Sequence, residues 1–467
     1  MKNRWKKRLF ILTIASIIVW LQPCSSLGQN DSSTSLLFAQ LMEESAYSLG
    51  ILAYVYGYPV VEMYWGRYRF TSAFGLNRLY HFPRLADHRS MMRGANNDTL
   101  YSLAWVDLSR EPVLLHVPDT QGRYYVFQLI DFFTNTFDYV GKRVTGTQEG
   151  DYAIVGPGWQ GSLPMGIKRI NAPTNSVLLL GRTLVYGQDD LPNVNALQEL
   201  YKLTPLSRWG KNGKDPYQLR KPVRPPIDHW GHPLKFFQIL NVGLGENPPP
   251  AHDAGLMGLF KIIHVGQGKP FDIDAMDPAI VKGLERAIKI GKQISSARPS
   301  TTEQARFGLS IGNIGSYEGD YLSRFAYAIA PGGIGALTPD ECIYFGVHVD
   351  HEGQTLSGKH SYRLRFEKGT LPPVDAFWSV TIYKLPAFQL VENPISRYSI
   401  GDRSKGLKYG QDGSLEIIIQ QSPPDGTKQA NWLPAPGGDF SLLLRAYMPT
   451  TEILDGQWTV PPVSRIE

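Results

Sequence analysis

Cysteine is nearly absent from this chain of 467 residues, which contains only Cys24 and Cys342. If Cys24 is lost with the N-terminal segment, a single thiol remains, and an internal disulfide is excluded. Cys342 lies in a strand-like apolar run, whereas a catalytic thiol requires an activating base. We therefore expect Cys342 in the core.

The chain also lacks a real excess of charge of one sign. Its net charge is +5, but five basic residues fall within the first eight positions, so the remainder is close to neutral. Nucleic acid is therefore not an expected partner. Hydrophobic residues make up 42% and charged residues 19%, which are globular values and exclude wholesale disorder.

Apolar runs long enough to cross a bilayer are missing as well. The N-terminal run LFILTIASIIVWL has 13 residues, whereas a membrane span needs about 20. It follows the basic segment MKNRWKKR and precedes small and polar residues, which is typical of a secretory signal peptide. We expect residues 1–28 to be cleaved before Gln29, giving a periplasmic or secreted protein without a stable membrane span. Lipidation of Cys24 and an uncleaved anchor are the alternatives.

Helical and strand-like patterns alternate along the rest of the chain. Residues 36–68 have a helical pattern that Pro59 should kink or break into two helices. Short β-branched and aromatic runs separated by turn residues predict antiparallel strands of a sandwich or barrel. These runs cover residues 100–106, 113–117, 124–130, 151–161 and 176–187, and they resume from 327 to the end. Between them we predict a short helix from Asp190, a Pro- and Gly-rich connection over 205–253, and helices over 253–265 and 277–297.

The stretch from Gly94 to Arg143 carries the strongest polar constellation. Asp98 and Asp131 are the candidate acid/base pair, because two carboxyl groups with different pKa values can exchange protons with a substrate. The supporting candidates are Tyr101 as an orienting group, Arg143 as an electrostatic partner, and Asn97 and Thr99 as ligand contacts. In the alternative, the Asn-Asp-Thr run forms a turn and Arg143 pairs with an aspartate to close the sheet.

The C-terminal candidates are two tryptophans and two arginines. Trp378 and Trp432 could form a platform for a sugar ring, although tryptophans of β-sandwiches more often fill the core. Arg397 and Arg445 could bind a carboxylate or phosphate through the guanidinium group, or could form structural ion pairs with Asp375 or Asp439.

No metal or cofactor is predicted. His229 and His232 are separated by Trp-Gly and followed by proline, so a helix cannot bring the two imidazoles together. The GxGxxG match at 156–161 is not followed by a helical pattern that would bind a phosphate. The GxSxG match around Ser310 follows a helical rather than a strand-like pattern, so Ser310 is read as a loop serine.

Two sets of motifs resemble known bacterial families. NNDTLYSLAWVDL, the DxxxNxxDYVGKR stretch from Asp131 and GDYAIVGPGWQG resemble domain of unknown function 1254. YFGVHVDHEGQTLSGKHSYRLRF, ENPISRYSIGDR and NWLPAPGGDFSLLLRAYMP resemble domain of unknown function 1214. The resemblance implies a mainly β fold with helical additions (α+β) and two β-sandwich or jelly-roll-like domains. It supplies no catalytic residues.

Together these patterns predict an N-terminal domain at 36–200, a Pro/Gly-rich and helical connection at 201–326, and a C-terminal domain at 327–467. The leading hypothesis is an exported envelope protein that binds a small or glycan-like ligand in a cleft of the β-domains. If it is an enzyme, it would be a hydrolase using carboxylate acid/base chemistry. The alternative is a non-catalytic structural module that forms symmetric homo-oligomers.

Overall fold

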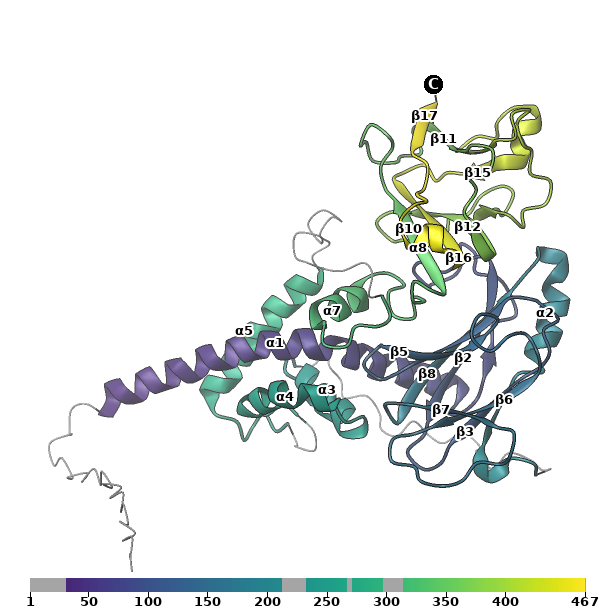
Figure 1. Ribbon diagram of the computed structural model, residues 1–467. Coiled ribbons are helices and arrows are strands. Elements are labelled where there is room, and N and C mark those ends of the chain that lie inside the picture. Colours follow the sequence, from purple (N-terminus) through teal and green to yellow (C-terminus); the bar gives the residue numbers. More distant parts are fainter. Residues whose placement is uncertain (1–30, 212–231, 267–270, 297–313, 467) are drawn as a thin grey trace, which may run out of the picture.

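The computed structural model describes residues 31–211, 232–266, 271–296 and 314–466 (Figure 1). Two β-sandwiches and a group of helices make up the molecule, and the long helix α1 projects away from both sandwiches (Figure 1). The mixed α+β fold with sandwich-like domains is therefore confirmed. The expected signal peptide, His229 and Ser310 lie outside the described residues.

The N-terminal sandwich consists of a five-stranded and a four-stranded sheet. The first has the order β1-β2-β8-β4-β5 and the second the order β7-β6-β3-β9. Buried side chains such as Val106, Val113, Phe127 and Ile154 fill the space between them. The strands are β1 (Tyr80–His81), β2 (Thr99–Asp107), β3 (Val113–Val117), β4 (Tyr125–Ile130), β5 (Thr136–Gly141), β6 (Gly150–Val155), β7 (Lys168–Asn171), β8 (Ser176–Leu184) and β9 (Lys202–Pro205), with helix α2 (Leu191–Gln198) before β9.

The C-terminal sandwich also has two sheets, in the orders β10-β16-β12-β13 and β15-β14-β11-β17. Its core contains Leu364, Val380, Ile417 and Leu442. The elements are β10 (Cys342–Val347), β11 (Ser361–Phe366), β12 (Val374–Lys384), β13 (Ser399–Gly401), β14 (Leu415–Gln420), β15 (Trp432–Pro434), β16 (Phe440–Pro449), α8 (Thr451–Leu454) and β17 (Val463–Ile466). The sequence-predicted strands of both sandwiches are confirmed, because their alternating and β-branched patterns match the buried faces of these sheets.

The predicted break at Pro59 does not occur. Helix α1 runs without interruption from Asp31 to Phe74 and contains Pro59. A proline inside a helix costs about 3 kcal/mol, because it removes one hydrogen bond and crowds the preceding turn. Burial of the flanking residues Tyr56 and Val60 against the neighbouring helices offsets this cost.

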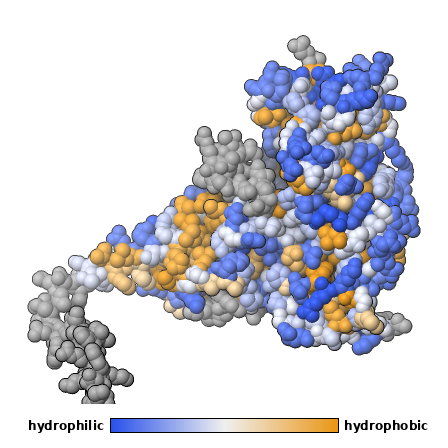
Figure 2. Space-filling model, in the orientation of Figure 1, coloured by the Kyte–Doolittle hydropathy of each residue, from blue (hydrophilic) through white to orange (hydrophobic). Residues whose placement is uncertain are grey.

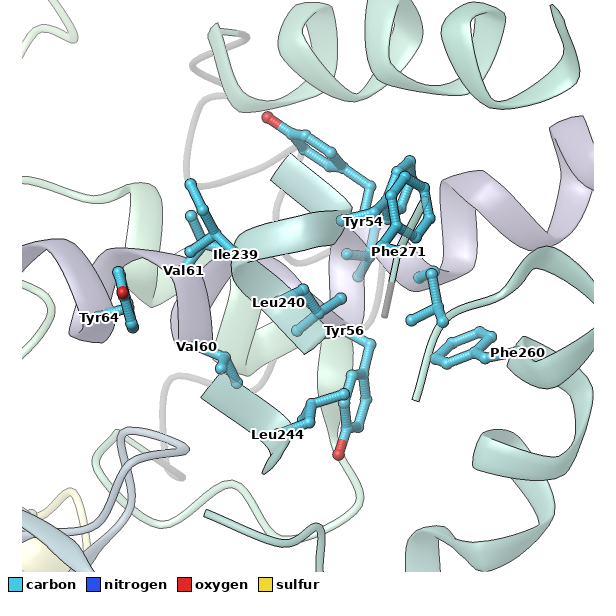
Figure 3. Close-up of a cluster of buried hydrophobic side chains, with 14 of the residues drawn as sticks. Tyr54, Tyr56, Val60, Val61, Tyr64, Ile239, Leu240, Leu244, Phe260 and Phe271 are labelled. Carbon is cyan, nitrogen blue, oxygen red and sulfur yellow. The ribbon is translucent and has the colours of Figure 1, made fainter. Parts of the chain in front are cut away.

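Four shorter helices pack around α1. They are α3 (Lys235–Glu246), α4 (Ala254–Phe260), α5 (Pro278–Ser296) and α7 (Tyr321–Ile329). Side chains of α1 and α3 interdigitate in the cluster drawn in Figure 3, which includes Tyr56, Val60, Leu240 and Leu244. The sequence missed α3, because we read its residues as part of the Pro/Gly-rich connection, and it also missed α7.

The five-stranded sheet connects all three parts of the molecule. The face opposite the sandwich core is covered by helices at one end, where Trp105 and Leu178 join the cluster around α1. At the other end Tyr124 and Leu184 pack against Tyr447 of the C-terminal sandwich. Groups on this face therefore lie where the three parts of the molecule meet. In the described residues, no helix is long and apolar enough to cross a membrane.

Candidate functional site

The polar run before β2 forms a tight turn built around Asn96. Its Oδ1 accepts hydrogen bonds from the backbone N–H groups of Asp98 and Thr99, both at 3.0 Å, and from the Thr99 hydroxyl at 3.1 Å. This is an Asx-type turn, in which an amide side chain replaces a backbone acceptor. The turn directs Asp98 toward the C-terminal sandwich.

Asp98 joins the two sandwiches. Its Oδ1 pairs with Arg403 Nη2 at 2.7 Å, and its Oδ2 accepts a hydrogen bond from the Ser379 hydroxyl at 2.7 Å. Asp98 is 2% exposed, so both interactions are shielded from water. The guanidinium of Arg403 also lies 4.3 Å from the centre of the Phe377 ring. Asp98 is thus the centre of a buried interdomain ion pair.

Tyr101 and Arg445 belong to the same interface. The Tyr101 hydroxyl accepts a hydrogen bond from Asn96 Nδ2 at 2.9 Å. Arg445 donates to the carbonyl of Gly94 at 2.8 Å and to the Tyr383 hydroxyl at 2.8 Å. The structure therefore brings Asp98, Tyr101 and Arg445 together. They meet inside the interface, and Arg445 is only 3% exposed.

Asp98 and Asp131 do not meet, which corrects the proposed acid/base pair. Thr99, next to Asp98, lies opposite Leu184 of β8, whereas Ile130, next to Asp131, lies opposite Leu178. Six residues of β8 separate these positions, or about 20 Å at the rise of a strand. The two carboxylates are at opposite ends of the sheet and cannot act on one small substrate.

Asp131 closes the turn between β4 and β5. Its Oδ1 accepts hydrogen bonds from the backbone N–H groups of Phe133 and Asn135, both at 2.8 Å. Burial raises the pKa of Asp131 to about 6, and the two backbone donors, with Arg324 nearby, limit the rise. A carboxyl group with this pKa is a general-acid candidate. Both of its strong contacts are to its own turn, however, and the side chain supports that turn.

Arg143 lies at an open groove between β5 and the segment that leads into β10. Its Nη1 pairs with Asp340 at 2.7 Å and its Nε with Glu341 at 2.6 Å. The groove has a volume of about 510 Å³ and is lined by residues including Thr136, Asp138, Tyr139, Arg143, Thr338 and Asp340. The sequence hypothesis that Arg143 closes the sheet by pairing with an acidic residue agrees with these contacts.

Glu341 fixes the position of the Arg143 guanidinium. Its side chain is 1% exposed, and its Oε1 accepts a hydrogen bond from the Tyr124 hydroxyl at 2.7 Å. Burial raises the pKa of Glu341, while Tyr124 and Arg143 stabilise its charged form. Glu341 therefore positions the guanidinium and does not itself reach the groove.

The two predicted tryptophans are buried, which corrects the platform hypothesis. Trp378 and Trp432 are each 2% exposed, so neither offers a ring face to a ligand. Trp432 also donates its Nε1–H to the carbonyl of Gln420 at 2.8 Å. Strand alternation turns Trp378 into the sandwich core, whereas Trp432 lies on the sheet face opposite to the core residue Leu433 and is buried there.

The side chains of Arg397 and Asn97 donate hydrogen bonds to backbone carbonyls. Arg397 Nη1 donates to the carbonyls of Gln429, Ala430 and Trp432 at 2.8–3.1 Å. Asn97 Nδ2 donates to a backbone carbonyl of the preceding loop. Both side chains order loops, and the ion pairs considered for Arg397 and Arg445 with Asp375 and Asp439 are not seen in the described chain.

No group of three or more His, Cys, Asp or Glu side chains within the described ranges could hold a metal ion. His232 Nε2 lies 3.8 Å from Glu285 Oε1.

Cys342 is fully buried, and burial raises the pKa of its thiol far above the usual value, so the core interpretation of Cys342 is confirmed.

Sequence reasoning missed Arg182, Ser379, Tyr383 and Arg403 as interface residues. Arg182 is 6% exposed, donates to Gln128 Oε1 at 3.0 Å, and lies over the Tyr101 ring at 5.7 Å. A usable signal existed for Arg182, because a lone charge within the apolar run SVLLLGRTL must be buried with partners. Ser379, Tyr383 and Arg403 occupy ordinary alternation positions or a turn and gave no such signal.

Comparison with known proteins agrees with this division of the chain. The family model described as a protein of unknown function, DUF1254, matches residues 76–205, and that for DUF1214, also of unknown function, matches residues 341–451. The first range spans every strand of the N-terminal sandwich, from β1 to β9. No curated protein matches the chain.

Two of the solved structures that match the chain are from Vibrio parahaemolyticus and Burkholderia cenocepacia. The VPA0106 protein from Vibrio parahaemolyticus is 26% identical with a TM-score of 0.69, over 90% of this chain and 100% of that one. A putative uncharacterized protein from Burkholderia cenocepacia is 12% identical with a TM-score of 0.42, over 94% and 98% of the two chains, and is too distant to support an argument. The two family matches, which confirm the order seen in the sequence motifs, identify the chain as one that carries a DUF1254 domain followed by a DUF1214 domain.

Proposed function

We propose that the protein binds a small, polyhydroxylated, glycan-like ligand in the groove beside Arg143. The observation that carries this proposal is the groove itself, whose volume of about 510 Å³ falls in the range of small-molecule sites. It lies between the N-terminal sandwich and the segment entering the C-terminal sandwich, a common position for ligand sites.

The lining of the groove suits hydroxyl groups. Asp138 and Asp340 provide carboxylate acceptors, and Thr136 and Ser316 provide hydroxyls that both donate and accept. Phe137 supplies an apolar surface on which a sugar ring can pack. Arg143 remains fixed by its two carboxylate partners, so its remaining donors are held in a defined direction.

Binding is better supported than hydrolysis. Glycoside hydrolysis by paired carboxyls needs one group that stays protonated and reaches the leaving oxygen. Beside this groove the carboxyl with the raised pKa is Glu341, whose side chain is 1% exposed and already bonded. A hydrolytic version of the proposal would have to use Asp138 and Asp340, and the same experiment tests it.

The test is calorimetric titration of the mature protein with soluble envelope-type oligosaccharides, together with reducing-end assays for hydrolysis. The Asp138→Asn variant removes one carboxylate acceptor from the groove, and Asp274→Asn, an exposed carboxylate in the helical part, is the matched control. We expect binding that is weakened about tenfold or more in Asp138→Asn, the equivalent of about 1.4 kcal/mol, and unchanged in the control. Equal binding by both variants, or none by the wild type, would reject the groove as the ligand site.

A structural or assembly role is the second candidate, because the projecting end of α1 is apolar and uncovered. Leu36, Leu37, Phe38 and Leu41 are 57–71% exposed, and Figure 2 shows apolar surface continuing over the helices. Such surface commonly marks an interaction site. Light scattering should detect an oligomer that the double variant Leu37→Ser, Leu41→Ser disrupts and that Met165→Ser, an exposed control on the N-terminal sandwich, does not. A monomer at all concentrations would refute this role.

We also propose export to the periplasm or beyond, with cleavage before Gln29. The basic and apolar N-terminal pattern supports this. Mass spectrometry of the protein recovered from the envelope fraction tests the cleavage position, and a retained Met1 in that fraction would contradict it.

A further inference from the structure

A second cavity lies where α1, α3, β2 and β8 meet. Its volume is about 170 Å³, and its lining includes Arg67, Tyr68, Leu76, Asp107, Ser176 and Glu246. A cavity of about 150 Å³ accommodates a molecule the size of benzene. The cavity shares no lining residue with the groove beside Arg143, so its occupancy is independent of the function proposed above.

Two of the charges on its wall cancel each other. Arg67 Nη2 forms an ion pair with Glu246, and Arg67 Nη1 donates to the Ser176 hydroxyl at 2.6 Å. The guanidinium also lies 5.4 Å from the ring centre of Tyr64 and 5.0 Å from that of Phe132. Arg67 is thus held in place and neutralised, which leaves little attraction for an anionic ligand.

Asp107 is the remaining charge, and it is fixed in place. Its backbone N–H donates to Asn77 Oδ1 at 2.7 Å, and its Oδ1 accepts the backbone N–H of Ser109 at 3.0 Å. Within the described residues its carboxylate forms no ion pair, although the residue is only partly exposed. The charged groups of the lining therefore sum to one negative charge, held on a strand end that cannot move away.

The uncharged part of the lining combines Leu76, Tyr64 and Tyr68 with the polar residues Thr71, Ser109 and Asn175. Leu76 and the ring of Tyr68 line the cavity beside Asp107. A cation is attracted both by a carboxylate and by an aromatic face. A small pocket with apolar and aromatic surface and one carboxylate outside any ion pair fits a ligand with an ammonium group and a short apolar body.

We propose that this cavity binds a small organic amine, with its ammonium group on the Asp107 carboxylate and its apolar part against Leu76 and Tyr68. The role of Arg67 and Glu246 is to close the far wall without contributing net charge.

Calorimetric titration of the full chain with benzylamine tests the proposal, with benzyl alcohol and benzoate as neutral and anionic probes of similar size. We expect benzylamine to bind at least about tenfold more tightly than either, the equivalent of about 1.4 kcal/mol, because a charge-assisted hydrogen bond to the carboxylate is stronger than a neutral one. Tighter binding of benzoate, or equal binding of the alcohol, would overturn the assignment of the charge. If benzylamine does not bind at millimolar concentration, the proposal that this cavity is an amine site is wrong.

Two variants locate the site. Asp107→Asn should abolish the preference for benzylamine, whereas Asp119→Asn, whose carboxylate also accepts the N–H two residues on, should leave it unchanged. Leu76→Trp fills the cavity without altering the carboxylate and should weaken binding of the amine as well. Unchanged affinity in a folded Leu76→Trp protein would place the amine elsewhere and refute the proposal, even if Asp107→Asn fails to fold.

Discussion

Asp131 should make the folded protein less stable as the pH rises from 4 to 7. In the unfolded chain its carboxyl titrates at the usual value of 3.8, whereas burial raises the pKa to about 6 in the folded chain. Between these pH values the folded chain binds more protons than the unfolded chain, so the free energy of unfolding falls as pH rises. The difference between the two pKa values corresponds to about 3 kcal/mol, of which about 2 kcal/mol is lost between pH 4 and pH 7.

The Asp131→Asn variant isolates this contribution from that of other groups. Its side-chain oxygen can still accept the backbone N–H groups of Phe133 and Asn135, so the turn is preserved. The weaker contact from Asn135 Nδ2, at 3.3 Å, is lost at every pH and adds only a constant offset. The variant carries no charge, and its stability should therefore lack this part of the pH dependence.

Urea denaturation at half-unit intervals from pH 4 to pH 7 measures the effect. The free energy of unfolding of Asp131→Asn minus that of the wild type should increase by about 2 kcal/mol across this range. A difference that is flat, or that decreases with pH, would refute the reasoning and would mean that the backbone donors and Arg324 outweigh burial.

Three further substitutions test the packing. An Ala at Gly57 would place its Cβ 2.4 Å from Leu240 Cδ2 in the contact between α1 and α3, so Gly57→Ala should destabilise the protein by about 1–3 kcal/mol in thermal or urea unfolding. Gly66→Ala in the same helix places its Cβ in ordinary van der Waals contact with Trp105, 3.8 Å from Cζ2, and should stabilise by about 0.5–1 kcal/mol; a similar effect at both positions would contradict the packing argument. Asp98→Ala leaves the largely buried Arg403 with only its longer contact to Asp402, at 3.3 Å, and should cost about 3–5 kcal/mol, measured by urea unfolding, with a loss below 1 kcal/mol contradicting a buried interdomain pair.

The strands could be predicted because their evidence is local. In HSYRLRF, for example, every second side chain is buried, and the observed strand β11 at Ser361–Phe366 has this alternation. The turn before β2 was likewise readable from Asn, Asp and Thr in succession. The role of Asn96 as its acceptor could not be distinguished from that of Asn97 until the backbone was placed.

Only part of the candidate site could be predicted from the sequence. The stretch that contains Asp98 and Tyr101 was identified as important, and it does lie at the junction of the two sandwiches. Its partners Ser379 and Arg403 are about 300 residues away along the chain, and no single-sequence pattern links such positions. Whether a carboxylate faces a substrate or an arginine is decided by this distant contact.

By itself, the sequence determined a β-rich chain with helical segments and the burial of Cys342, because these follow from periodicity and composition, and the resemblance of its motifs to two known families implied the two β-sandwich domains. Tertiary structure alone decided that α1 continues through Pro59, since neighbouring helices supply the burial that offsets a local penalty. It also decided that Asp98 and Asp131 are separated by the length of β8, since strand register, rather than distance along the chain, sets which side chains meet.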